Sequence, residues 1–263
     1  MSGQVLRETR DGVQTLTLHN PESRNALTMD MSGQLCEWLR EAAADPSVRV
    51  VVLTGSGGAF CAGGDVKAMA AGRDFGLPLA RRADRLRERA ESVRLLHEMS
   101  KPTVAVLPGA AAGAGLGLAL ACDFRLASSE AKLTTAFARV GLSGDFGVNW
   151  LLTRMLGVAR ARELMMFAPV LGAQEAHALG LLTRVFPAET FAAQSAALVA
   201  ELAAGPTAAF GHMKQAINLS ASAALSPSLD AEAQHQACCS LTEDHAGATR
   251  AFAEKRKPVF SGR

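Results

Sequence analysis

The sequence predicts an α/β fold whose last part is entirely helical. Through residues 1–190, short β-branched and apolar runs alternate with amphipathic segments, which is typical of a parallel sheet covered by helices. From residue 191 to residue 263 only helical patterns occur. Because amphipathic helices bury their apolar faces against other elements, we expect this tail to lie on the body or on a neighbouring subunit and to serve oligomerisation.

The first half of the chain alternates strands with helices. The predicted strands are 13–18, 48–53 and 103–107, and the predicted helices are 29–44, 79–98 and 113–122. The first strand alternates polar and apolar residues, whereas the other two are continuously apolar and should be buried on both faces. The first helix is expected to be capped by Thr28 and to end at Asp45, which precedes a proline.

The second half contains fewer strands. The predicted strands are 124–127 and 182–186, and the predicted helices are 148–156, 159–167, 173–179, 189–204, 207–219 and 228–254. The dipeptides at 205–206 and 226–227 end in proline and separate the last three helices. We therefore divide the chain into a core, 1–190, and a C-terminal helical region, 191–263.

The composition is that of an ordinary globular protein. The chain has 263 residues, 49% hydrophobic and 20% charged, with a net charge of +2. One run of arginines, over residues 81–89, is interleaved with acidic residues and is interpreted as a solvated helix face. Only 5% of the residues are aromatic and none is tyrosine, which argues against nucleic-acid binding.

The five cysteines form no recognisable disulfide framework, and the first twelve residues are unlike a signal peptide. We therefore expect a cytoplasmic location. One group of residues suggests a metal site: His235, Cys238, Cys239 and His245. Its spacing fits no zinc pattern, so a plain helix is favoured and no metal is expected.

Residues 102–122 are uncharged and long enough to span a bilayer. They contain Pro108 and four glycines, and their first part is β-branched. A strand, a turn and a buried helix explain this composition better, so we expect no membrane association.

Two loops of small residues follow two of the buried strands: 60–65 (FCAGGD) and 108–117 (PGAAAGAGLG). Small residues leave backbone N–H groups uncovered, so two converging loops would form a two-donor pocket for an oxyanion. The second loop also suggests a dinucleotide-binding turn, but Leu118 stands where the third glycine is needed. The oxyanion pocket is therefore favoured.

Four segments resemble the signatures of the crotonase superfamily, the enoyl-CoA hydratase/isomerase family. They are 20–27 (NPESRNAL), 60–66 (FCAGGDV), 113–123 (GAGLGLALACD) and 252–260 (FAEKRKPVF). The resemblance implies a spiral of ββα units with two packed sheets and a helical C-terminal region that builds a homotrimer or a dimer of trimers. It also implies an acyl-CoA thioester substrate, with coenzyme A as part of the substrate and no separate cofactor.

The resemblance further implies roles for individual residues. The backbone N–H groups of Ala62 and Ala114 would hold the thioester oxygen while an enolate forms. Residues 69–79 would border the acyl pocket. The coenzyme A side would be lined by Arg24, Asn25, Ala26, Ala62, Gly63, Gly64, Asp65, Ala114 and, from a neighbouring subunit, Lys255. A solvated tail lysine is the alternative for Lys255.

Two positions depart from the hydratases of the family, which activate water with two glutamates. This chain has Gly117 and Phe137 at those positions, so water addition by that route is not expected. Asp145, within 141–147 (GLSGDFG), resembles the acid/base of the epoxyphenylacetyl-CoA isomerase group. One carboxylate suffices for a 1,3-proton shift, and apolar neighbours would raise its pKa. The alternative is that Asp145 caps the next helix.

The predicted function is an enoyl-CoA isomerase. The alternatives are an enoyl-CoA hydratase with atypical water activation and a weakly catalytic CoA-thioester-binding protein. Four further residues are expected to be structural: Cys61 as a small buried residue, His97 at a helix end, and Asp123 and Arg125 between helix and sheet.

Overall fold

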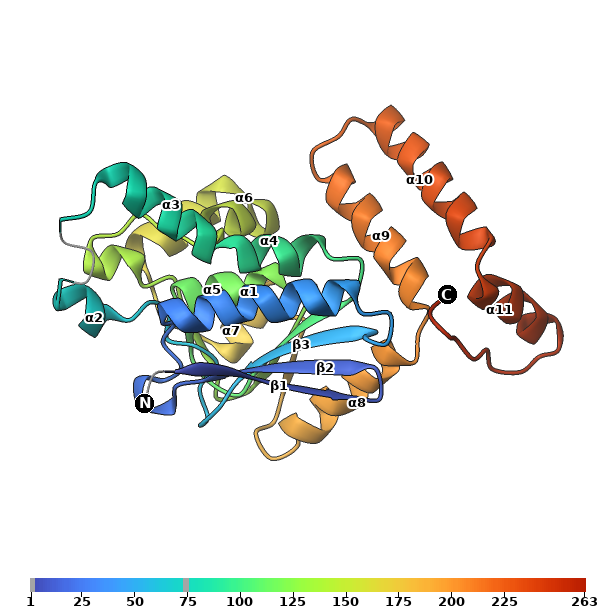
Figure 1. Ribbon diagram of the computed structural model, residues 1–263, viewed down its shortest axis with the longest axis horizontal. Helices are drawn as coiled ribbons and strands as arrows, with labels where there is room; N and C mark the ends of the chain where they lie inside the picture. The colour runs from blue at the N-terminus through green and yellow to red at the C-terminus, as the bar shows by residue number, and fades with distance from the viewer. Residues whose placement is uncertain (1–2, 73–75) are drawn as a thin grey trace.

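The computed structural model describes residues 3–72 and 76–263, and it shows a layered α/β body from which a helical arm extends (Figure 1). A six-stranded sheet forms the centre, in the order β1 (Gln4–Arg10), β2 (Val13–His19), β3 (Val50–Gly55), β4 (Thr103–Leu107), β6 (Phe124–Ser128) and β9 (Arg184–Phe186). Strand β1 is antiparallel to β2, and all other neighbours are parallel. A second sheet contains β5 (Ala111–Ala112), β7 (Lys132–Thr134) and β8 (Leu171–Gly172). The predicted α/β class with two sheets is confirmed.

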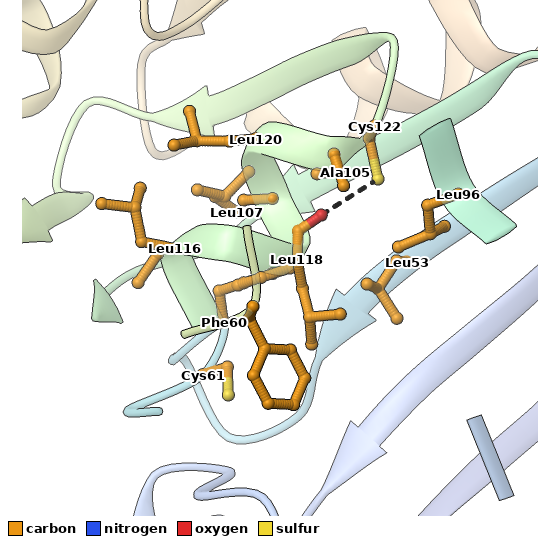
Figure 2. Packing of buried hydrophobic residues seen from close by; sticks show 14 of the residues in the cluster. Leu53, Phe60, Cys61, Leu96, Ala105, Leu107, Leu116, Leu118, Leu120 and Cys122 are labelled. Carbon is orange, nitrogen blue, oxygen red and sulfur yellow. Dashed lines mark hydrogen bonds between the residues drawn. The ribbon is translucent and has the colours of Figure 1, made fainter. Parts of the chain in front are cut away.

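Helices cover both faces of the large sheet. They are α1 (Met29–Ala44), α2 (Val66–Ala70), α3 (Leu79–Arg89), α4 (Glu91–Glu98), α5 (Ala114–Ala121), α6 (Val148–Phe167), α7 (Ala173–Ala178), α8 (Phe191–Ala203), α9 (Thr207–Ser220), α10 (Leu225–Ser240) and α11 (Glu243–Ala253), with two 3-10 turns, η1 (Pro21–Ser23) and η2 (Phe137–Val140). Helices α1, α4 and α5 lie on one face and α8 lies on the other (Figure 1). Figure 2 shows the core on the α5 side, where Phe60, Leu107 and Leu118 pack together.

Several predicted boundaries are confirmed by local geometry. The Thr28 hydroxyl accepts a hydrogen bond from the Met31 N–H at 3.1 Å and caps α1. Gly157, with φ of +76°, interrupts α6 between the two predicted helices. The uncharged stretch 102–122 contains β4, β5 and the buried helix α5, as expected. Among the described residues, no helix combines the length and apolarity needed to cross a bilayer.

Two predicted helices are wrong in length. The segment 79–98 is divided at Ala90 into α3 and α4. The segment 228–254 is divided into α10 and α11, because the Thr242 hydroxyl accepts from the His245 N–H and starts a new helix. Strand β1 was not predicted, because Val5 is its only buried residue and the strand therefore has no alternation of apolar and polar residues.

The arm formed by α9, α10 and α11 leaves the body beside α4 (Figure 1). Helix α8, by contrast, belongs to the body, where Val199 and Ala203 pack against Val50 and Val52 of the sheet. The arm leaves several apolar side chains exposed, among them Ile217, Leu225 and Phe252. These residues have no cover within the single chain.

Candidate active site

The two small-residue loops meet at one edge of the large sheet. They follow β3 and β4, which are parallel neighbours, so both loops leave at the carboxyl ends of adjacent strands. The N–H groups of Phe60 and Cys61 both donate to the Ala110 carbonyl at 3.0 Å, and the Ala112 N–H donates to the Cys61 carbonyl at 2.9 Å. The predicted convergence of the loops is confirmed.

Glycine is required where the loops approach most closely. Gly63 has a φ of +93°, and a Cβ there would lie 2.7 Å from the Ala112 carbonyl oxygen and 3.3 Å from the Ala114 nitrogen. The backbone of the first loop thus lies directly against the start of α5. Any side chain at position 63 would push the two loops apart.

Two backbone N–H groups at this junction have no hydrogen-bond partner among the described residues, those of Gly64 and Ala114. Ala114 begins α5, where the first N–H groups have no partner within the helix and the helix dipole is positive. The Ala62 N–H is not available, because it donates to the Arg24 carbonyl at 2.9 Å. The prediction that the Ala62 amide holds an oxyanion is therefore wrong, and Gly64 is the residue that offers a donor.

A free N–H was not predicted for Gly64, which was expected only to line the coenzyme A side. The reason is a backbone contact between two of the family-like segments, 20–27 and 60–66. Because Leu27 forms a parallel β-bridge with Gly64, the segment before it lies beside Ala62 and accepts its N–H. That contact joins residues distant in sequence and could not be read from the loop alone.

Asp145 lies in the loop before α6, with one carboxylate oxygen buried. This oxygen, Oδ1, has no hydrogen-bond partner among the described residues. The N-cap of α6 is Gly147, and no side-chain cap bond is formed there. Asp145 is therefore not a helix cap, and that alternative is wrong.

The environment of Asp145 favours its protonated form. Burial raises the pKa of the Asp145 carboxyl above its usual range, and the positive charge of Arg89 opposes this effect in part. A carboxylate with a raised pKa is a stronger base than an ordinary aspartate, and when protonated it is a suitable acid near neutral pH.

Asp145 opens into a cavity of about 320 Å³. The cavity is lined by Met29, Met69, Gly72, Arg82, Arg85, Leu86, Arg89, Phe137, Leu142, Ser143, Gly144 and Asp145. Two of these residues connect it to the paired loops: the Met69 methyl group lies 2.6 Å from where a Cβ of Gly64 would be, and the Phe137 ring lies 3.8 Å from the same point on Gly113. Gly64 and Ala114 are not among the described lining residues, so Met69 and Phe137 connect the cavity to the loops that carry these two amides. The segment 69–79 was predicted to border the acyl pocket, and two of its residues, Met69 and Gly72, line this cavity. Residues 73–75 of the segment lie outside the described residues.

Neither of the two hydratase positions offers a carboxylate. A Cβ on Gly117 would lie 2.4 Å from the Phe146 carbonyl oxygen, so this position has no room for a side chain. Phe137 is 6% exposed and forms part of the cavity wall. Asp145 is the only carboxylate among the described lining residues.

The predicted coenzyme A contacts divide into two groups. Ala62, Gly63, Gly64 and Asp65 lie in the first loop beside Ala114, and Arg24 lies next to them with an exposed side chain. Asn25 is fully buried, and its side-chain amide donates to the carbonyls of Ser56 and Ala59 while its oxygen accepts from Asn20. The prediction that Asn25 lines the ligand is wrong, because its side chain is used to hold the loops together. Ala26 is also buried and offers little surface.

Lys255 lies apart from this cavity. It follows α11 at the end of the arm, on the opposite side of the molecule from α2 and α3 (Figure 1). Its side chain is exposed. A contact with bound coenzyme A therefore requires a second copy of the chain.

The arginine run on α3 is not simply a solvated face. Arg82, Arg85 and Arg89 line the cavity, and Arg82 and Arg89 are only partly exposed. The interpretation of the whole run as solvated is corrected for Arg82 and Arg89, whereas Arg85 lines the cavity but is exposed, as predicted. The sequence could not separate them from Arg81 and Arg87 because the helix face toward the cavity is set by tertiary contacts.

The remaining candidates are structural. Burial raises the pKa of the Cys61 thiol to about 12, and its sulfur lies 3.0 Å from the Asn25 carbonyl oxygen. The His97 ring packs edge-on against Trp150, with ring centroids 5.2 Å apart, and burial lowers its pKa. In residues 3–72 and 76–263, no three metal-ligating side chains come together.

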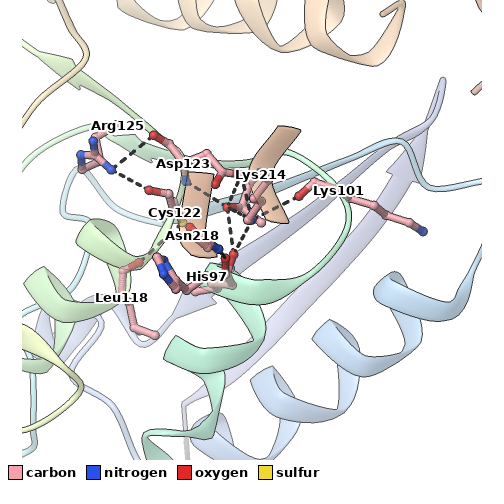
Figure 3. Close-up of polar contacts among 10 residues, drawn as sticks. His97, Lys101, Leu118, Cys122, Asp123, Arg125, Lys214 and Asn218 are labelled. Carbon is pink, nitrogen blue, oxygen red and sulfur yellow. Dashed lines mark hydrogen bonds and ion pairs between the residues drawn. The ribbon is translucent and has the colours of Figure 1, made fainter. Parts of the chain in front are cut away.

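Asp123 and Arg125 join helix and sheet, as expected, and the structure adds a partner that the sequence analysis missed (Figure 3). The Asp123 carboxylate accepts from the Thr103 N–H at 2.8 Å and from the Lys214 ammonium at 2.9 Å. The Arg125 guanidinium donates to the Leu181 and Cys122 carbonyls. Lys214 comes from α9, so this cluster links the arm to the body.

Comparisons with known proteins agree with this geometry. Residues 8–263 match the family enoyl-CoA hydratase/isomerase. The chain is 37% identical over 264 residues to a 1,2-epoxyphenylacetyl-CoA isomerase from Escherichia coli K12, with 98% of each chain covered. It is 39% identical over 265 residues to a Rhodobacter capsulatus protein named "Probable enoyl-CoA hydratase", with both chains fully covered. A crystal structure of an enoyl-CoA hydratase from Polaromonas sp. JS666 superimposes with a TM-score of 0.92 at 34% identity, covering 98% of this chain and 100% of that one. This chain, with its crotonase fold, belongs to the enoyl-CoA hydratase/isomerase family of acyl-CoA enzymes.

Proposed function

We propose that this enzyme moves a double bond along an unsaturated acyl-CoA, with Asp145 as the single general acid/base. The observation that carries the proposal is the buried, unpartnered Asp145 oxygen in a cavity whose other described lining residues include no second carboxylate. Hydration by two carboxylates has no support here, because position 117 is filled by the Phe146 carbonyl and position 137 is phenylalanine. One carboxylate that can both take and return a proton meets the needs of an isomerase.

The chemistry follows from the two ends of the site. The N–H groups of Gly64 and Ala114 hydrogen-bond the thioester oxygen of a 3-enoyl-CoA and stabilise the negative charge that develops there. Asp145 removes a proton from C2, the electrons of that C–H bond delocalise into a dienolate, and the protonated Asp145 returns the proton to C4. The product is the 2-enoyl-CoA. Each amide donor is worth about 3 kcal/mol of barrier in comparable sites.

The test follows a 3-enoyl-CoA in deuterated water by mass spectrometry. We expect the 2-enoyl-CoA as product, with no added water. Asp145→Asn is expected to lower kcat by 10²- to 10⁴-fold, the usual contribution of a general acid/base, while the affinity for a saturated acyl-CoA stays nearly unchanged. Glu88→Gln, the same carboxylate-to-amide change at an exposed residue outside the described cavity lining, is the control.

Three outcomes would contradict the proposal. Rapid conversion to a 3-hydroxyacyl-CoA would make the protein a hydratase. Tight binding without turnover on a varied panel would make it a CoA-thioester-binding protein. Full isomerase activity in Asp145→Asn would remove this residue from the reaction.

The same proposal includes a homotrimer, or a dimer of trimers, as the working form. The arm exposes Ile217, Leu225, Leu241 and Phe252, between 69% and 88% of each side chain, and such a surface is unfavourable in a monomer. Assembly through this surface would also allow Lys255 to reach a neighbour's coenzyme A. Light scattering measures the mass directly, and a stable monomer would contradict the assembly.

A further inference from the structure

We propose that Asn25 is a positioning residue for the oxyanion pocket: from a fully buried position it fixes the direction of the Gly64 N–H. The inference rests on the proposed function in that it takes the Gly64 and Ala114 amides as donors to the thioester oxygen. It is carried by the contacts between residues 24–27, which we call the strap, and residues 61–64 of the first loop.

One strap contact determines where the Gly64 N–H points. The Leu27 N–H donates to the Gly63 carbonyl at 2.7 Å. This carbonyl and the Gly64 N–H belong to one planar trans peptide, so the two groups point in opposite directions. Because Leu27 holds the carbonyl on the strap side, the Gly64 N–H is directed away from the strap and stays available to a ligand.

The peptide between Gly63 and Gly64 needs such a support. Neither residue has a side chain and Gly63 has a φ of +93°, so this part of the backbone has more conformations open to it than an ordinary loop. The Gly64 N–H can stabilise an enolate only while the peptide keeps its direction. Displacement of a group in a site by about 1 Å can cost about 100-fold in rate.

The Asn25 side chain holds the strap itself in place. Its amide nitrogen donates to the Ser56 carbonyl at 2.8 Å and to the Ala59 carbonyl at 2.9 Å. Its amide oxygen accepts from the Asn20 N–H at 2.9 Å. Asn25 also has a φ of +59°, a left-handed conformation that asparagine adopts more readily than most residues. The strap therefore turns at Asn25, and Leu27 meets the first loop two residues later.

Two further side chains join the strap to its surroundings. The Asn20 side-chain amide donates to the Ala26 carbonyl at 3.0 Å from a half-buried position. The Cys61 thiol donates to the Asn25 carbonyl at 3.0 Å. Loss of the Asn20 amide loosens the strap without emptying a fully buried position, so it is a milder change than loss of the Asn25 side chain.

A structural role and a positioning role make different predictions. Asn25 makes several buried hydrogen bonds, so its replacement lowers the stability of the protein in both cases. Only a positioning role also changes how strongly a bound thioester carbonyl is polarised. The carbonyl of the ligand is therefore the group to observe.

The experiment measures the carbonyl stretching frequency of bound hexanoyl-CoA, isotopically labelled at the thioester carbon, by infrared difference spectroscopy. This saturated thioester does not react. The two amide donors are expected to lower the frequency of the bound ligand below its value in buffer. Asn25→Gly, which accepts the φ of +59°, is expected to move the frequency back toward the free value. With a 3-enoyl-CoA, kcat is expected to fall about 100-fold while KM changes little.

Asn218→Gly is the matched control. It is the same substitution at a half-buried asparagine of α9, whose side-chain amide donates to the His97 carbonyl at 2.9 Å. We expect this variant to lose stability and to keep the carbonyl frequency of the intact enzyme. Asn20→Ala is the second strap variant, and it is expected to shift the frequency in the same direction as Asn25→Gly but by less.

An unchanged frequency in folded Asn25→Gly would overturn the inference. If that variant does not fold, an unchanged frequency in Asn20→Ala would overturn it instead. An equal shift in Asn218→Gly would do the same, since loss of stability alone would then explain the effect. Because hexanoyl-CoA does not react, these results do not depend on whether Asp145 catalyses isomerisation. Absence of turnover with a 3-enoyl-CoA would count against the proposed function alone.

Discussion

The carbonyl oxygen of Phe146 occupies the space in which residue 117 would otherwise place its side chain: a Cβ built on Gly117 would lie 2.4 Å from that oxygen. Helix α5 and the loop before α6 therefore meet backbone to backbone. This contact holds the Asp145–Phe146 segment against the helix that begins at Ala114, whose N–H has no partner in the part of the chain that the structure describes. A glycine at 117 is thus a condition for the site, and a hydratase glutamate at that position is incompatible with it.

Gly117→Ala is expected to destabilise the fold and reduce isomerase activity. The added methyl group meets backbone atoms, so the loop carrying Asp145 must move, and overpacking of this kind costs about 1–3 kcal/mol. Chemical denaturation measures the loss. Gly33→Ala is the control: it lies in α1 with nothing within 4 Å of the new Cβ, and we expect a gain of about 0.5–1 kcal/mol there. A neutral Gly117→Ala, or hydratase activity in Gly117→Glu, would contradict this account of the contact.

The acidic limb of the pH profile of kcat/KM should report the pKa of Asp145. Asp145 acts first as a base, so activity is expected to rise with pH through this pKa, which burial raises above the ordinary aspartate value of about 3.9. Arg89 lowers the same pKa. Replacing Arg89 with leucine is therefore expected to move the acidic limb to higher pH.

Arg89→Lys, which keeps the charge, is the control for that shift and should leave the limb close to its original position. The measurement is the midpoint of the limb, so a general loss of activity does not disturb it. A limb unmoved by Arg89→Leu, or moved to lower pH, would show that Asp145 is not the titrating base.

Asp145→Asn is expected to stabilise the protein at neutral pH. Because the folded-state pKa of Asp145 lies above its unfolded value, folding favours the protonated acid. The original enzyme therefore loses stability as pH rises through the folded-state pKa, whereas the asparagine variant does not. The difference in free energy of unfolding should be present at pH 7 and vanish below about pH 3.9. The opposite sign at pH 7 would mean that the charged carboxylate has a stabilising partner.

The large elements could be predicted from sequence because each has a local signal. The buried strands β3 and β4 are continuous apolar runs, and α1 has both a helical period and a capping threonine. The missed strands β5, β7 and β8 are two or three residues long, so they have no period to detect. The predicted helix 79–98 is divided at Ala90, where the sequence has no proline or glycine that would predict a break.

Some site residues could likewise be predicted from a local motif, whereas others depend on tertiary contacts. Ala114 and Asp145 could be proposed because each lies in a motif of the family. The amide donor is Gly64 and not Ala62 because the Ala62 N–H already donates to the Arg24 carbonyl. Asn25 is buried because its side chain donates to carbonyls more than 30 residues away in the sequence. The arginines of α3 that line the cavity could not be predicted either, because every arginine in the run has a similar sequence environment.

Thiol reactivity should distinguish the buried cysteines of the body from the exposed Cys238 on the arm. Burial raises the pKa of Cys61 and Cys122 to about 12, and Cys36 is buried as well, whereas Cys238 is exposed. Since the thiolate is the reactive form, iodoacetamide is expected to label Cys238 first in the native protein. Peptide mapping identifies the site. Rapid labelling of Cys61 would require a more open loop than the structure has and would restore this residue as a possible nucleophile.

The Lys214–Asp123 ion pair should determine whether the arm stays on the body. Lys214 is 8% exposed and also donates to the Leu96 carbonyl at 2.8 Å, so Lys214→Met leaves a buried carbonyl and a mostly buried carboxylate without their cation. Removing one partner of a buried pair costs on the order of 3 kcal/mol. Adding Asp123→Asn to Lys214→Met should recover part of that loss, because the uncompensated charge is then gone. Chemical denaturation measures both effects, and light scattering should show whether assembly weakens with them. A double variant no more stable than Lys214→Met alone would mean that the lysine acts through its carbonyl contacts and not through Asp123.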